Sequence, residues 1–191
     1  YNVTITDQKG CFKDTSVTVL EPALVSVDTA FQDSVSCNGL FDGSASVAVS
    51  GGNGIYSYLW SDGQTTSTAS NLTAGTYNVT ITDQKGCFKD TSVIVLEPDA
   101  LLIASMSMDS ASCNGVADGT ATANGITGGN GINSFSWNTT PVQTTNPATG
   151  LAAGNYTVTV TDQKGCFTTR DTTVLEPDAL LIASMSMDSA S

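Results

Sequence analysis

An internal repeat constrains this chain more than any other feature. The segment YNVTITDQKGCFKDTSV, residues 1–17, returns unchanged at residues 77–93, and a diverged third copy begins at Tyr156. A second segment, residues 97–112, returns unchanged at residues 176–191. One unit is therefore roughly 80 residues long, which is the size of a small domain repeated in series.

The repeat predicts where the domains begin and end. We expect residues 1–22 to be the C-terminal hairpin of a truncated repeat, and residues 23–98 and 99–177 to be complete repeats. Residues 178–191 are expected to form the first strand of a following repeat. Because the first residue is Tyr1 and not Met, we also expect the sequence to be a piece of a longer protein.

Within each unit apolar residues alternate with polar ones, as in the segments 44–49, 77–82 and 156–161. A period of two is typical of strands with one buried face, and Gly- and Asp-rich segments separate them at hairpin spacing. We therefore predict an all-β fold of tandem immunoglobulin-like Greek-key β-sandwiches, similar to fibronectin III and PKD domains, arranged as a rod. In the first complete unit the expected strands are residues 24–36, 43–50, 55–60, 64–67, 68–72, 76–83 and 87–96.

Four aromatic residues are predicted to lie in the structural core. Trp60 and Trp137 end the third long strand of their units, where immunoglobulin-like domains bury an aromatic side chain. Tyr77 and Tyr156 each follow a Leu-x-Ala-Gly-x segment, which is the position of a tyrosine corner at the start of the penultimate strand.

Charge and composition exclude several classes of function. The chain carries 18 acidic and 6 basic residues, a net charge of -12, whereas binding to nucleic acid or to anionic membranes needs clustered Lys and Arg. There is no histidine, so the commonest catalytic base and transition-metal ligand is missing. We expect a protein that is not an enzyme, needs no cofactor, and neither binds nucleic acid nor inserts into a membrane.

Three longer motifs run through the first complete unit in order: CNGLFDG from Cys37, GGNGIYSYLW from Gly51, and NLTAGTYNVTITDQKGC from Asn71, with VLEP after them. They resemble the SprB-type repeat of gliding-motility adhesins, which are bacterial cell-surface proteins that use type IX secretion. The second unit has versions of the same motifs but departs at residues 138–145, NTTPVQTT. The resemblance implies a secreted, extracellular filament on a bacterial cell surface that serves as a mobile adhesin or its stalk.

We interpret the chain as a structural stalk segment of such an adhesin. Its expected partners are neighbouring repeats of the same chain, other copies in a filament or bundle, and a surface polysaccharide at a tip outside these residues. One alternative is the stalk of a secreted multidomain enzyme. The other is a repeated polysaccharide-binding module that uses the loop aromatics Tyr56, Tyr58 and Phe41, which the second unit replaces with Asn133, Phe135 and Ala117.

The five cysteines occur at two per unit and form no Cys-x-x-Cys pair, so disulfides are predicted rather than a metal site. Counting alone would pair Cys37 with Cys87 and Cys113 with Cys166. In an immunoglobulin-like sandwich, however, these turns lie at opposite ends of strands roughly 25 Å long, whereas bridged Cα atoms lie within about 7 Å.

We therefore favour a bridge between Cys37 and Cys166 across the repeat junction. The partners of Cys11, Cys87 and Cys113 would then lie outside this sequence. Pairing within a unit, on a rearranged sheet order, stays open as the alternative.

Two further kinds of site are weaker candidates. Aspartates recur in the turns, and Asp42 and Asp118 are the candidates for calcium, although Asp-Gly is first of all turn chemistry and no metal site is predicted. Asp-Ser and Asp-Thr pairs resemble the O-glycosylation signal of the bacterial group in which these adhesins occur. The candidate acceptors are Thr29, Ser34, Ser110, Thr172 and Ser189.

Overall fold

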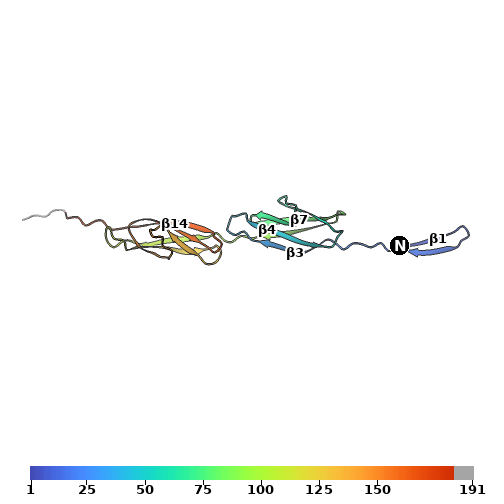
Figure 1. Ribbon diagram of the computed structural model, residues 1–191, viewed down its shortest axis with the longest axis horizontal. Coiled ribbons are helices and arrows are strands. Elements are labelled where there is room, and N and C mark those ends of the chain that lie inside the picture. The colour runs from blue at the N-terminus through green and yellow to red at the C-terminus, as the bar shows by residue number, and fades with distance from the viewer. Residues whose placement is uncertain (183–191) are drawn as a thin grey trace, which may run out of the picture. The chain divides into compact units, whose positions relative to one another are not determined.

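The structure is a computed structural model that describes residues 1–182 (Figure 1). Within this part of the chain it has fourteen β-strands and no helix, so the all-β prediction is confirmed. The first two, β1 (Asn2–Thr6) and β2 (Phe12–Ser16), form a two-stranded hairpin. Residues 178–182, which begin the segment expected to form the first strand of a following repeat, are exposed and irregular, and the rest of that segment, residues 183–191, lies outside the described residues.

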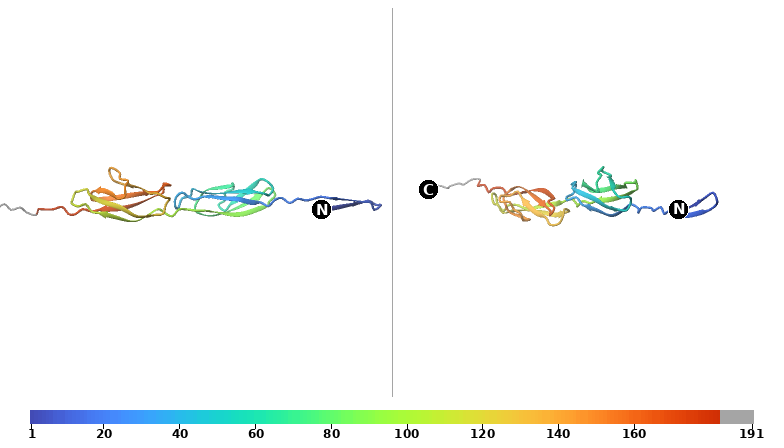
Figure 2. Two further views of the ribbon diagram at one scale, coloured as in Figure 1. Left: turned by 90° about the horizontal axis from the view of Figure 1, so that it is seen from below. Right: turned by 45° about the vertical axis from the view of Figure 1, so that its right-hand side comes forward.

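The first complete repeat contains two three-stranded sheets. One has the order β3 (Ser26–Asp33), β4 (Gly43–Ser50), β6 (Thr68–Leu72), and the other has the order β5 (Tyr56–Trp60), β7 (Gly75–Asp83), β8 (Phe88–Val95). The first, second and fourth strands of the repeat thus form one layer and the third, fifth and sixth form the other, which is the order of an immunoglobulin-like sandwich. Figure 2 shows the layers from two further directions.

The second repeat has the same topology. Its sheets are β9 (Leu102–Asp109), β10 (Gly119–Thr127), β12 (Ala148–Leu151) and β11 (Ser134–Trp137), β13 (Gly154–Thr161), β14 (Phe167–Val174), with β10 and β13 central. Side chains from all six strands meet in one hydrophobic core. The immunoglobulin-like prediction is therefore confirmed for both repeats.

Alternation along the strands decides which side chains enter the core. In β13, Val158 and Val160 are fully buried, while the threonines beside them are half-buried. The same rule buries Val79 and Ile81 in β7. Successive side chains of a strand point to opposite faces, so a Thr-Val-Thr-Val sequence gives one apolar and one polar face.

The predicted strand at residues 64–67 is wrong, so each repeat has six strands in the described structure rather than seven. The side chain of Gln64 takes its place, because its amide bonds both backbone groups of Ser70: Nε2 donates to the carbonyl oxygen (2.9 Å) and Oε1 accepts from the amide (3.0 Å). Gln143 does the same with Thr149 in the second repeat. In each repeat one amide side chain thus hydrogen-bonds the backbone at the open edge of β6 or β12, where a further strand would otherwise pair.

The predicted core aromatics divide into two groups. Trp60 and Trp137 are each 1% exposed, and their indole Nε1 atoms donate to the carbonyl oxygens of Thr66 (2.8 Å) and Thr145 (2.9 Å). Tyr77 and Tyr156 are only half-buried, at the edge of the core rather than inside it. The hydroxyl of Tyr156 donates to the carbonyl oxygen of Ala152 (3.0 Å), and this need for a polar partner keeps the ring at the boundary.

The chain forms two compact units. One comprises Tyr1–Gln32, Ser44–Ser70 and Gly75–Ile94. The other comprises Asp33–Gly43, Asn71–Ala74 and the described residues from Val95 onward. The loop between β3 and β4, which carries Cys37, therefore belongs to the same unit as the second repeat.

Candidate functional site

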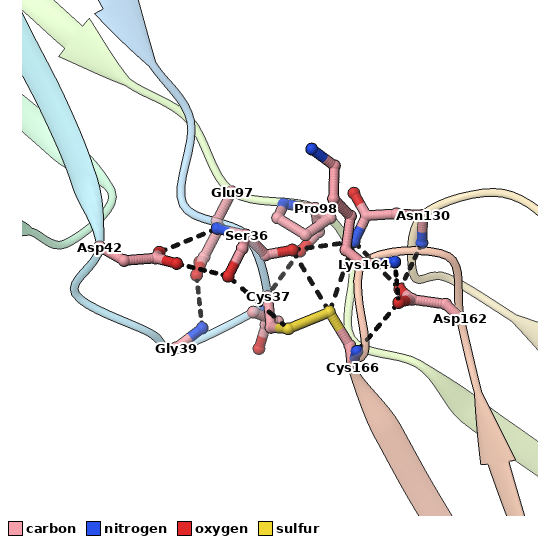
Figure 3. Close-up of a disulfide and its surroundings, with 11 residues drawn as sticks. Ser36, Cys37, Gly39, Asp42, Glu97, Pro98, Asn130, Asp162, Lys164 and Cys166 are labelled. Carbon is pink, nitrogen blue, oxygen red and sulfur yellow. Dashed lines mark hydrogen bonds between the residues drawn. A yellow bond between two sulfur atoms is a disulfide. The ribbon is translucent and has the colours of Figure 1, made fainter.

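The most distinctive site is a disulfide between Cys37 and Cys166 (Figure 3). Its Cα atoms are 5.6 Å apart, although the two residues are separated by 129 positions in the sequence. The structure thus brings together the pair that strand direction favoured. Neither pairing within a repeat is present, because Cys87 and Cys113, like Cys11, are free and exposed.

The loop that carries Cys37 is closed by the aspartate at its end. Asp42 accepts hydrogen bonds from the backbone amide of Ser36 (2.9 Å) and from its hydroxyl (2.5 Å). These bonds hold the pKa of Asp42 below its usual range, and the positive charge of Lys164 adds to the effect. The carboxylate therefore shapes the loop.

The same loop is fastened to the segment that follows β8. Glu97 accepts a hydrogen bond from the backbone amide of Gly39 (2.9 Å), and Asn38 Nδ2 donates to the carbonyl oxygen of Pro98 (3.1 Å). Two separate contacts thus fasten the loop just after Cys37, at Asn38 and Gly39, independently of the disulfide.

Cys166 is held by a turn built around one buried carboxylate. Asp162 is 6% exposed, and its Oδ1 accepts from the backbone amides of Lys164 (2.8 Å) and Cys166 (2.9 Å). Its Oδ2 accepts from the backbone amide (2.7 Å) and side chain (3.0 Å) of Asn130. Burial alone would raise the pKa of Asp162, but hydrogen bonds from Asn130, Cys166 and Lys164 outweigh it, and the pKa is lowered.

Asn130 also connects this turn to the loop of Cys37. Its Nδ2 donates to the carbonyl oxygen of Ser36 (2.9 Å) and lies 3.5 Å from the Sγ of Cys166. That Sγ lies 3.3 Å from the same carbonyl oxygen, but a disulfide sulfur has no proton to donate, so Asn130 is the donor. The hydrogen bond from Asn130 to Ser36 thus joins the same two segments as the disulfide.

Each half of this site occurs a second time with its cysteine unpaired. Around Cys113, Asp118 accepts from the amide of Ser112 (2.8 Å) and Glu176 accepts from the amide of Gly115 (2.7 Å). Around Cys87, Asp83 is 5% exposed and accepts from the amides of Lys85 (2.8 Å) and Cys87 (2.9 Å). Both halves are therefore built by their own repeat, whether or not a bridge forms.

The weaker candidates take other roles. Asp42 and Asp118 cap their loops, and no group of three or more His, Cys, Asp or Glu side chains that could hold a metal ion occurs among residues 1–182. Thr29, Ser34 and Ser110 are exposed, Thr172 is half-buried, and Ser189 lies outside the described residues. In the described part of the chain no helix is long and apolar enough to cross a membrane.

The loop aromatics do not share one environment. The hydroxyl of Tyr56 donates to the carbonyl oxygen of Gly51 (2.6 Å), and the ring is half-buried. Phe135 packs against the hydrophobic core of the second repeat. Phe41 is 67% exposed, and Tyr58 is half-buried.

The sequence interpretation missed the buried anchors of the two turns. Among the turn aspartates it singled out only Asp42 and Asp118, and it gave no role to Asp83, Asp162, Asn53 or Asn130. A signal was present, since an Asp side chain commonly bonds the amides that follow it in a turn, and Asp-Gln-Lys-Gly-Cys occurs three times unchanged.

Comparison with known proteins finds a family match for one segment of the chain. Residues 29–65 match the family model described as the SprB repeat, so the resemblance seen in the sequence is confirmed for this segment. No curated protein matches the chain. A solved structure of three N-terminal domains of the bacteriophage RB49 Highly Immunogenic Outer Capsid protein (Hoc) is similar, with 18% sequence identity and a TM-score of 0.45. The match covers 81% of this chain and 59% of the phage chain.

Proposed function

We propose that this chain is a stalk segment of a long, repetitive adhesin on a bacterial cell surface, of the gliding-motility type and exported by type IX secretion. The SprB repeat match at residues 29–65 and the tandem immunoglobulin-like repeats support this function. The segment acts mechanically, as a spacer, and carries out no reaction. The rod arrangement expected from the sequence is part of the same proposal.

The observation that carries the proposal is a second covalent connection between successive repeats. The backbone joins them through Glu97, Pro98 and Asp99, and the Cys37–Cys166 bridge joins them again. Proline fixes its own φ and restricts the residue before it, so the backbone connection is itself stiff. A pulling force along the chain is then shared between the backbone and the bridge.

The bridge also stabilises the folded state. In the chain-entropy model, closing a loop of 129 residues contributes on the order of 4 to 5 kcal/mol by restricting the unfolded chain. A domain of a surface filament is under tension while it works. Such a domain gains from any connection that opposes unfolding.

The contacts of the aromatic side chains favour a stalk over a repeated polysaccharide-binding module. A sugar platform needs exposed rings with free faces, but Tyr56 is half-buried with its hydroxyl bonded to Gly51. The exposed ring of Phe41 has Ala117 at its place in the second repeat.

Single-molecule pulling on the chain tests the mechanical function. With the bridge intact, unfolding should release no length from the 129 residues that it encloses. Addition of a reductant should add roughly 430 to 460 Å of chain at 3.3 to 3.6 Å per residue. The Cys37→Ser variant should show the long extension with or without reductant. Equal extension of the parent chain in both conditions would contradict a bridge that carries force.

Surface location is tested separately on cells that make the native protein. Antibodies against this segment should label intact cells, and an external protease should remove the label. Deletion of whole repeats should shorten the surface filament in proportion. A segment that is labelled only after the cells are lysed would overturn the proposal.

A further inference from the structure

The loop between β10 and β11, residues 128–133, contacts three segments that are separate in the sequence. They are the segment before β9, the turn that carries Cys166 and the loop that carries Cys37. All of them, with the β10–β11 loop itself, belong to one compact unit. Figure 3 shows Asn130 of this loop beside the disulfide. The β10–β11 loop therefore lies where the parts of the bridge site meet.

Two glycines of this loop make room for the segment before β9. The amide of Gly129 donates to the carbonyl oxygen of Asp99 (2.9 Å). A Cβ at Gly128 would lie 2.0 Å from the carbonyl oxygen of Ala100, and its φ of 74° is in the left-handed region that favours glycine. The segment before β9 thus rests directly on backbone that no side chain covers.

Asn130, the next residue of the loop, holds the two halves of the bridge site together. Its backbone amide (2.7 Å) and its side-chain Nδ2 (3.0 Å) both donate to Asp162, which anchors the turn of Cys166. The same Nδ2 donates to the carbonyl oxygen of Ser36 (2.9 Å), the residue before Cys37. One side chain therefore bonds both halves, and these bonds do not involve a sulfur atom.

The first complete repeat has the same loop at residues 51–55, and it holds the segment before β3. The amide of Gly52 donates to the carbonyl oxygen of Ala23 (2.7 Å). A Cβ at Gly51 would lie 2.0 Å from the carbonyl oxygen of Leu24, which is the distance found at the equivalent glycine of the second repeat. Holding the preceding segment is therefore a property of the repeat and does not depend on a disulfide.

The asparagines of the two loops share one contact. Asn53 donates to Asp83 from its backbone amide and from its Nδ2, both at 2.8 Å, as Asn130 donates to the equivalent aspartate. Asn130 in addition donates to Ser36. The two residues therefore separate two roles: both asparagines hold an aspartate turn, and Asn130 also holds the loop of the partner cysteine.

Bridge formation requires that two thiols separated by 129 positions in the sequence meet. Contacts that hold their loops together raise the effective concentration of one thiol at the other. Opposite charges act in the same direction, because Lys164 in the turn of one half acts electrostatically on Asp42 in the loop of the other. Contacts that do not involve sulfur thus bring the two cysteines into reach.

We propose that Asn130 is the positioning residue of the bridge, which holds the loop of Cys37 against the turn of Cys166 before the sulfur atoms react. It acts through the two cysteines and does not itself react. The glycines beside it fix the loop from which it acts. This inference rests on the proposed function, in which the bridge carries force, and it names the residue that controls how readily that bridge closes.

The oxidant is a small-molecule disulfide such as oxidised glutathione. Cys37 is half-buried and Cys166 is 9% exposed, so the Cys37 thiolate attacks first, releases one glutathione thiolate and forms a mixed disulfide. The Cys166 thiolate then attacks the Cys37 sulfur and displaces the second glutathione. Two protein thiols become one disulfide, and one glutathione disulfide becomes two thiols. The second step needs the two loops in contact, so it is the step that Asn130 accelerates.

The experiment uses the full chain of 191 residues with its three free cysteines replaced by serine: Cys11→Ser, Cys87→Ser and Cys113→Ser. The reduced chain is mixed with oxidised glutathione, quenched with acid at intervals and analysed by peptide mapping. In Asn130→Ala the second step should be about tenfold slower, which corresponds to about 1.4 kcal/mol. The mixed disulfide at Cys37 should therefore accumulate in this variant.

Asn53→Ala is the matched control, because Asn53 makes the same contacts with its aspartate and belongs to the other compact unit. It should lower the unfolding midpoint of the first repeat about as much as Asn130→Ala lowers that of the reduced second repeat. It should leave the rate of the second step unchanged. The comparison of the two variants therefore isolates the contact with Ser36 from the support of an aspartate turn.

Asn130→Ser is a milder second variant, for use if the reduced Asn130→Ala chain does not fold. A serine hydroxyl has one proton, so it cannot donate to Asp162 and Ser36 at once. Its second step should also be slower than that of the parent chain. Urea unfolding of each reduced variant shows whether the second repeat is folded when the rate is measured.

Equal rates of the second step in the parent and Asn130→Ala chains would overturn the inference. Slowing by Asn53→Ala to the same extent would also overturn it, and so would loss of the reduced fold in both Asn130 variants, because stability alone would then be sufficient. A failure here leaves the surface labelling of cells unchanged. Conversely, a protein absent from the surface can still close its bridge in solution, so the two proposals fail separately.

Discussion

Residues 1–17 and 77–93 have one sequence and two environments. Both form a hairpin, and in both the Asp of the turn accepts two backbone amides at 2.8 and 2.9 Å. In β1 of the first copy Val3 is 47% and Ile5 is 65% exposed, whereas in β7 of the second copy Val79 is 1% and Ile81 is 0% exposed. The local sequence therefore specifies the turn and strand pairing, and the opposite sheet supplies the burial.

Among the variants that test this difference in burial, Trp60→Ala is expected to have the largest effect on stability. The substitution removes the largest fully buried side chain of the first repeat and should destabilise that repeat by roughly 3 to 5 kcal/mol. Amide hydrogen exchange of residues 77–93 should then approach that of residues 1–17. Trp137→Ala is the matched control and should lower only the stability of the second repeat. An unchanged midpoint of the first transition in Trp60→Ala would contradict the core role.

A pair of isoleucine variants separates the effect of burial on stability from the effect of the local sequence. Ile81→Ala should lower the free energy of unfolding by about 2 to 5 kcal/mol, because it leaves a cavity in the core. Ile5→Ala changes the same position of the other copy and should alter the free energy of unfolding by less than about 0.5 kcal/mol. Urea unfolding of both variants measures the difference. Equal effects would mean that the first hairpin is buried as deeply as the second.

Glycine variants test the turn itself. Gly86 and Gly10 both have a φ of 86°, and neither would have a neighbour within 4 Å of an added Cβ. The left-handed backbone of Gly86→Ala should therefore destabilise the first repeat by about 1 to 2 kcal/mol without any steric clash. Gly10→Ala should leave the unfolding midpoint of that repeat unchanged. If both variants lowered this midpoint, the two hairpins would be coupled.

The smallest expected effect is a pH dependence that belongs to one copy of the turn. Burial would raise the pKa of Asp83, but hydrogen bonds from Asn53, Cys87 and Lys85 outweigh it and lower the pKa from its ordinary value of 3.8 to about 2. Because the folded-state pKa is depressed, this stabilisation is present above about pH 4 and is lost as the pH falls towards 2.

Urea midpoints of the first repeat between pH 6 and pH 2 measure this contribution. The loss of stability across that window should be smaller in Asp83→Asn than in the parent chain. Asp7→Asn should leave the loss unchanged. If the Asp83→Asn and parent curves had the same slope, another group would be responsible.

The sequence was sufficient for features that depend on one strand or one turn at a time. Alternating valines and threonines in β7 and β13 predicted the sheets, and strand direction predicted that Cys37 would face Cys166 rather than Cys87. Features that join distant segments of the chain were harder to predict from the sequence. Gln64 replaces a strand by bonding Ser70 across a bend, and a period-two pattern does not distinguish that segment from a strand.

The buried aspartates that anchor the cysteine turns were also missed because they contact residues far away in the sequence. Asp83 and Asn53 are 30 residues apart, and nothing local marks their contact. Tyr156 was expected in the core because it lies at the start of the penultimate strand, in the position of a tyrosine corner, and the hydrogen bond to the backbone upstream that defines such a corner is present. Its hydroxyl, which bonds Ala152, holds it at the boundary instead.

The Cys37–Cys166 bridge makes a covalent ring from most of the chain. If a protease cuts the backbone once at any bond inside this ring, the two pieces remain one molecule. Cys113 lies inside the ring, so a bridge from Cys113 to a cysteine of a following repeat would close a second ring that overlaps the first. Every peptide bond between Cys113 and Cys166 would then be spanned twice. A filament linked in this way would keep its distal end attached after one peptide bond inside the rings is cut.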